Sequence, residues 1–139
     1  MRGNLEGDLL PPLLLAGAVL TWVAGFDLIY ASQDADFDQR TGLHSVPARF
    51  GVARALALSS FLHVATVALL LAFGLRAELG LAWWIVLAGA ALLLVHEHRI
   101  VRPDDLSRVD MAFFTLNGWV GIALFVGGVI DLSLLGGGA

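Results

Sequence analysis

Four long apolar runs divide the chain, and short polar segments separate them. The runs are Leu9–Phe26, Ala55–Leu75, Leu79–Val95 and Met111–Ile130. As an α-helix, each run can cross a bilayer core of about 30 Å once polar residues at its ends extend it. The pattern predicts an all-α, multi-pass transmembrane bundle of four helices over residues 9–38, 52–75, 79–99 and 104–131.

Composition supports a membrane protein. The 139 residues are 58% hydrophobic and only 14% charged, with a mean hydropathy of +0.83. Soluble domains carry about 25% charged residues, so membrane lipid is the expected surrounding. A pI near 5.3 argues against nucleic acid as a partner. The chain has no cysteine, which excludes disulfides and thiolate metal sites.

Charge is concentrated in one stretch, from Asp27 to Gly51. Four of its carboxylates equal the whole formal net charge of −4. If the first helix continues through this stretch, Asp27, Asp34 and Asp38 fall within a wedge of roughly 40° on one face. Tyr30 lies near the same stripe, and Asp36 points to the opposite side. The spacing predicts a face with three carboxylates and a phenol.

Asp34 and Asp38 suit a divalent cation. As an i, i+4 pair of like charges, they repel one another by a few tenths of a kcal/mol in water. A cation would offset that repulsion. Mg²⁺ fits best because it binds one or two carboxylates together with waters and substrate phosphate oxygens. Calcium would need more protein oxygens, and zinc would prefer cysteine or histidine ligands.

These residues resemble a known family motif. The pattern Asp27-x-x-Tyr30-Ala31-x-x-Asp34-x-x-x-Asp38, followed by Arg40, Gly42, Ser45 and Phe50-Gly51, is similar to the second aspartate-rich motif of the UbiA superfamily of intramembrane prenyltransferases. It most resembles the 4-hydroxybenzoate polyprenyltransferase-like branch, which includes enzymes of the futalosine route to menaquinone. The resemblance continues to the segment EHRIVRPDDLSRVDMAFFTLNG.

The resemblance implies a transferase of ubiquinone or menaquinone biosynthesis. Such an enzyme moves a polyprenyl group from its diphosphate to an aromatic acid, either hydroxybenzoate-like or naphthoate-like, with Mg²⁺ as cofactor. By the same resemblance, Asp34 and Asp38 would hold the metal. Asp27 and Tyr30 are the catalytic candidates. The substrate-binding candidates are Gln33, Arg40, His44, Ser45 and Arg49.

The sequence also departs from the family pattern. Members have about nine helices and an earlier motif of the type Asn-Asp-x-x-Asp-x-x-x-Asp, which is absent here. We therefore expect this chain to correspond to the C-terminal part of the fold, to lack activity alone and to need a missing N-terminal half as partner. A non-catalytic cation-binding or assembly protein is the alternative. A CDP-alcohol phosphatidyltransferase ranks lower, because no Asp-Gly-x-x-Ala-Arg precedes Asp34.

Arginine positions predict the orientation. Arg2 and Arg76 fall on one side of the predicted topology. The six on the other side are Arg40, Arg49, Arg54, Arg99, Arg102 and Arg108. The positive-inside rule then predicts an inner-membrane protein whose acidic stretch faces the cytoplasm.

Several local expectations accompany this topology. Val46-Pro47 should be an extended step, and Pro103-Asp104 should begin the last helix. Trp83-Trp84 should be an interfacial anchor. His63 should bond to a neighbouring helix. The segment His96–Arg99 lacks a His-Glu-x-x-His pattern, so we expect no metal there, only a charged helix end facing the polar site.

Overall fold

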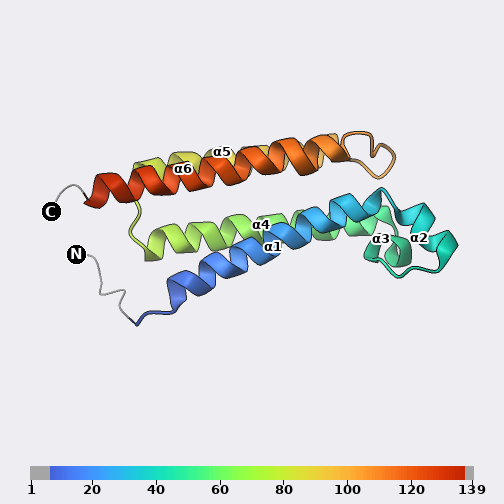
Figure 1. The fold of residues 1–139 in the computed structure, drawn as a ribbon, viewed down its shortest axis with the longest axis horizontal. Coiled ribbons are helices and arrows are strands. Elements are labelled where there is room, and N and C mark those ends of the chain that lie inside the picture. Colours follow the sequence, from blue (N-terminus) through green and yellow to red (C-terminus); the bar gives the residue numbers. More distant parts are fainter. Residues whose placement is uncertain (1–6, 137–139) are drawn as a thin grey trace.

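The computed structural model describes residues 7–136, which form a bundle of helices (Figure 1). The elements in chain order are α1 (Leu10–Ser32), α2 (Ala35–Thr41), α3 (Val46–Phe50), α4 (Val52–Arg76), α5 (Leu81–Ile100), the π-helix η1 (Met111–Leu116) and α6 (Asn117–Gly136). Four segments are long and apolar enough to cross a membrane, in agreement with the four predicted spans. Arg2 of the orientation argument lies outside the described residues.

The long helices pack as two pairs. Helix α1 lies along α4, and α6 lies along α5 (Figure 1). One apolar core joins the pairs around Phe26, Ile29, Leu56 and Leu94. A second core surrounds Trp83 near the opposite end. The short helices α2 and α3 lie together at one end of the bundle, so the acidic stretch caps that end.

Helix α1 begins with two prolines. Pro11 and Pro12 occupy its first turn, where the missing N–H groups cost nothing. The predicted continuous helix through Asp38 is wrong, however. The N–H groups of Gln33 and Asp34 bond three residues back instead of four, and Asp34 leaves helical geometry. This tight turn separates α1 from α2.

Glycines shape the segment between α2 and α4. Gly42 has φ of 73°, and its N–H bonds to the Asp38 carbonyl, so it ends α2. The extended step expected at Val46-Pro47 is wrong, because these two residues form the first turn of α3. Ser45 takes the extended conformation instead, and its Oγ accepts a hydrogen bond from the Ala48 N–H. Gly51, with φ of 92°, then turns the chain into α4.

Two further expectations are corrected at the other helix ends. Trp83 is only 4% exposed and packs edge-on against Phe73, so it is a core residue and not an interfacial anchor. Pro103 and Asp104 do not begin the last helix. They lie in a turn closed by backbone bonds between Arg102 and Asp105.

A buried carboxylate joins α6 to α5. Asp131 is 2% exposed, and its Oδ2 accepts a hydrogen bond from the Gly80 N–H at 2.7 Å. Its Oδ1 lies 3.4 Å from the backbone nitrogen of Trp83. The first N–H groups of a helix have no partner within the helix, so Asp131 caps α5 from a different helix.

Candidate functional site

The acidic end of the bundle carries all nine candidate residues on consecutive elements. Asp27 and Tyr30 lie on α1, and Gln33 and Asp34 form the turn that follows. The remaining candidates belong to α2, the next loop and α3, and they are Asp38, Arg40, His44, Ser45 and Arg49. The chain therefore places the nine candidates at one end of the bundle, on the last turns of α1 and the short elements that follow it (Figure 1).

Asp34 and Asp38 remain one helical turn apart in spite of the break. The Asp34 carbonyl accepts the Asp38 N–H at 2.8 Å, which is the i, i+4 relation of an α-helix. Asp34 is exposed and Asp38 is half-buried. Among residues 7–136, neither carboxylate forms an ion pair with an arginine. Two neighbouring carboxylates open to water match the usual protein contribution to a Mg²⁺ site.

Asp27 lies on the other side of the turn from this pair. It is exposed on α1 and directly follows Phe26, which is buried. Tyr30, one turn further along, is 42% exposed. The outward face of α1 therefore carries both catalytic candidates, while its inward face contacts α4. The turn at Gln33 removes the single straight stripe that the sequence predicted for Asp27, Asp34 and Asp38.

The cationic and polar candidates differ in their surroundings. Arg40 is exposed in the last turn of α2, and the Arg49 guanidinium lies 5.3 Å from the centre of the Phe50 ring. His44 is exposed in the loop. Ser45 has a structural role as the cap of α3, which accounts for a serine at this position without a substrate contact.

An apolar cavity lies deeper in the bundle. It has a volume of about 590 Å³ and opens between α1, α4, α5 and α6. Aromatic and aliphatic side chains form most of its wall, including Trp22, Leu70, Phe73, Trp83 and Leu124. A cavity of this size and character suits a hydrocarbon chain.

Sequence comparison identifies the family. The sequence profile described as the UbiA prenyltransferase family matches residues 2–128. The chain belongs to the UbiA prenyltransferase family. This finding confirms the resemblance drawn from the aspartate-rich motif.

Relatives of this UbiA-family chain carry a specific name. It is 41% identical over 114 residues to the 4-hydroxybenzoate octaprenyltransferase of Xanthomonas euvesicatoria pv. vesicatoria (strain 85-10), a match that covers 82% of the chain and 37% of the relative. It is 35% identical over 121 residues to the enzyme of that name from Nitrosospira multiformis, covering 87% of the chain and 41% of the relative. The chain thus spans about two fifths of the length of these relatives. No solved structure matches it.

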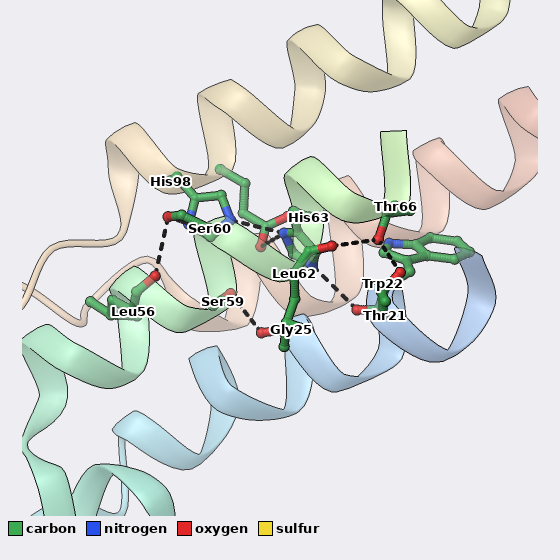
Figure 2. A network of polar contacts seen from close by, with 11 residues as sticks. Thr21, Trp22, Gly25, Leu56, Ser59, Ser60, Leu62, His63, Thr66 and His98 are labelled. Carbon is green, nitrogen blue, oxygen red and sulfur yellow. Dashed lines mark hydrogen bonds and ion pairs between the residues drawn. The ribbon is translucent and has the colours of Figure 1, made fainter. Parts of the chain in front are cut away.

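The structure also reveals a polar cluster that the sequence did not predict. His63 bonds to the neighbouring helix α1, as expected, because its Nε2 donates to the Trp22 carbonyl at 3.2 Å. Its Nδ1 lies 2.8 Å from His98 Nε2 (Figure 2). Glu97 is fully buried nearby, so it does not belong to the expected charged helix end, whereas His96 and Arg99 of that segment are exposed. A fixed packing register between α4 and α5 brings these residues together, and no local motif encodes it.

Proposed function

We propose that the whole protein transfers a polyprenyl group from its diphosphate to an aromatic acid, and that this chain supplies the diphosphate-binding part of the site. The observation that carries the proposal is the Asp34–Asp38 pair, one turn apart and followed in the sequence by Arg40 and Arg49, at the end of an apolar bundle in a UbiA-family chain. The names of the relatives favour 4-hydroxybenzoate as the acceptor, and a naphthoate-like acid is the second choice.

The arginines and carboxylates would act on the leaving group. Breaking the allylic C–O bond leaves negative charge on the diphosphate, and groups that stabilise this charge lower the barrier. A Mg²⁺ ion held by Asp34 and Asp38 would supply part of that stabilisation. Arg40 and Arg49 would donate charge-assisted hydrogen bonds to phosphate oxygens, and Gln33, His44 and Ser45 complete the proposed contacts.

The outward face of α1 would serve the organic partners. The Tyr30 ring can steady an allylic cation through its π-face. Asp27, three residues earlier, would orient the acceptor or take the ring proton that leaves after the new C–C bond forms. The apolar cavity beside Trp22 would hold the prenyl tail and keep water from the cation. In the proposed orientation, the protein lies in the inner membrane and its acidic end faces the cytoplasm.

Co-expression tests the proposal directly. Membranes containing this chain and the N-terminal part of a related prenyltransferase would receive Mg²⁺, labelled octaprenyl diphosphate and a panel of aromatic acids. We expect product with both parts and none with this chain alone. Asp34→Ala and Asp38→Ala should abolish the product.

Asp36→Ala is the matched control, because Asp36 is an exposed acid of the same helix that is given no role in the site. Equal losses for all three variants would refute the assigned roles of Asp34 and Asp38. If both parts insert stably but give no product, the non-catalytic cation-binding alternative gains support.

A further inference from the structure

A second cluster of potential ligands lies inside the bundle, apart from the acidic end. In the described part of the chain, His63, Glu97 and His98 are the one group of three or more such residues whose ligand atoms all lie within 4.8 Å of one another. The ring nitrogens His63 Nδ1 and His98 Nε2 are 2.8 Å apart, and Glu97 Oε1 is 4.0 Å from His63 Nδ1. Helix α4 contributes one residue and α5 contributes two.

Glu97 is the observation that calls for a ligand. Its side chain is 0% exposed, and neither carboxylate oxygen has a hydrogen-bond partner. An unpaired carboxyl group inside an apolar bundle is costly, and an unsatisfied buried polar group needs a physical explanation. Leu94, one turn earlier on α5, is a buried apolar residue and offers no compensation. A cation between the carboxylate and the two imidazoles would provide it.

The outer hydrogen bonds of both histidines fit metal ligation. Because a carbonyl can only accept, His63 Nε2 carries the hydrogen that it donates to Trp22, and its Nδ1 is left with a lone pair. His98 Nδ1 lies 3.1 Å from Ser60 Oγ, and that hydroxyl also donates to the Leu56 carbonyl (Figure 2). If His98 donates to Ser60, its Nε2 also presents a lone pair.

In this arrangement, the ring nitrogen of each histidine that points away from the proposed ion has a hydrogen-bond partner, and so does the Ser60 hydroxyl. The Ser60 hydroxyl then accepts a hydrogen bond from His98 Nδ1 and donates its single hydrogen to the Leu56 carbonyl. Two lone pairs 2.8 Å apart repel one another unless a cation lies between them. Ligating histidines almost always donate their other N–H to a carbonyl or another oxygen, and both histidines here have such a partner. We propose that His63 Nδ1, His98 Nε2 and Glu97 form a binding site for a first-row divalent transition ion, with Zn²⁺ the best match.

The ligand set and spacing select this class of ion. Two histidines and one carboxylate are typical of zinc and non-haem iron sites with an open position, whereas Mg²⁺ prefers oxygen ligands. In a tetrahedral site with ligands at about 2.0–2.1 Å, neighbouring ligand atoms are about 3.3 Å apart. The distances of 2.8 and 4.0 Å lie on either side of that value. Small side-chain movements would therefore close the site around an ion.

A second cavity gives the site room and access. It has a volume of about 570 Å³, and its wall includes Ser60, His63, Leu94 and His98. An ion could enter through this cavity, and a water molecule could fill the open coordination position. The cavity does not involve the acidic residues of the proposed prenyltransferase site, so the two proposals can fail independently.

Cobalt provides a direct test. The purified full chain in detergent, free of metal, would be titrated with Co²⁺ and followed by visible absorption. We expect one ion per chain with the spectrum of a four-coordinate site, and competition by Zn²⁺ but not by Mg²⁺. Glu97→Gln and His98→Gln should remove the signal. Ser60→Ala should weaken binding about 10–100-fold, the range found for outer-shell partners of metal ligands.

Matched controls separate this site from others. His96→Gln changes an exposed histidine of α5, and Asp36→Asn changes an exposed acid of the acidic end that has no role in either proposed site. Both should bind Co²⁺ like the unmodified chain. Unchanged binding by Glu97→Gln and His98→Gln, or no binding by the folded unmodified chain, would overturn the proposal.

Thermal unfolding covers the case in which a variant does not fold. Zn²⁺ should raise the unfolding temperature of the unmodified chain, since an ion that binds only the folded state stabilises it. An unfolding temperature unaffected by Zn²⁺ would also overturn the proposal.

Discussion

Asp131 offers a quantitative test of the packing between α5 and α6. Its carboxylate accepts hydrogen bonds from the N–H groups of Gly80 and Trp83, and the first of these is short, at 2.7 Å. A hydrogen bond to a charged acceptor contributes about 1.5–3 kcal/mol. The second bond, at 3.4 Å, adds little. We expect Asp131→Ala to lower the free energy of unfolding by about 2–3 kcal/mol.

Asp131→Asn separates charge from geometry. The amide keeps one acceptor oxygen but loses the negative charge at the N-terminus of α5, where the helix dipole favours it. Since charge-assisted bonds are roughly twice as strong as neutral ones, the Asn variant should lose about half as much stability as the Ala variant. The order of stability should be Asp, then Asn, then Ala.

Denaturant unfolding in detergent and amide hydrogen exchange would measure these effects. Exchange should accelerate at Gly80 and Trp83 in both variants. Ser133→Ala is the control, because within residues 7–136 the hydroxyl of this exposed serine donates only to the Val129 carbonyl of its own helix. If Asp131→Ala were no less stable than Ser133→Ala, or exchange at Gly80 were unchanged, the proposed cap would be refuted.

Two further predictions follow from other contacts. Gly25→Ala should lower the free energy of unfolding by about 1–3 kcal/mol, because a Cβ there would overlap the His63 imidazole. Gly118→Ala is the control, since a Cβ at that position would meet no atom within 4 Å and should cost nothing comparable. Denaturant unfolding measures both. Hydrogen bonds from Ser107 hold the pKa of Asp105 below its usual value of 3.8, so the stabilisation of this turn is present above that value and disappears as pH falls through the lowered pKa. Ser107→Ala should raise the Asp105 pKa in an NMR titration, and an unchanged pKa would contradict this cause.

The apolar runs were enough to predict the four spans, because a bilayer needs about 20 apolar residues per helix whatever the tertiary packing. Local signals for helix ends were also readable. The prolines mark the start of α1, and Gly42 marks the end of α2. The sequence likewise placed the acidic candidates together, since they are close along the chain. These features depend on local chemistry alone.

Features that depend on tertiary packing were not predictable. The turn at Gln33 interrupts a stretch without proline or glycine, and Asp34, the residue before α2, forms no side-chain cap bond that would favour the break. Trp83 is a good interfacial residue by type, but contact with Gly74 and Phe73 buries it. His63 and Glu97 are 34 positions apart in the sequence. Their approach requires a particular rotation of α4 against α5, which the apolar pattern does not specify.

The contact between α1 and α4 has a mechanical consequence for the acidic end. The two helices are joined by hydrogen bonds at three successive levels: Thr21 with Thr66, His63 with the Trp22 carbonyl, and Ser59 with the Gly25 carbonyl. A slide of α1 by one helical turn, about 5.4 Å, would break all three at once. These bonds therefore oppose sliding of α1 along α4, and they set the position of Asp27, two residues after Gly25, relative to α4.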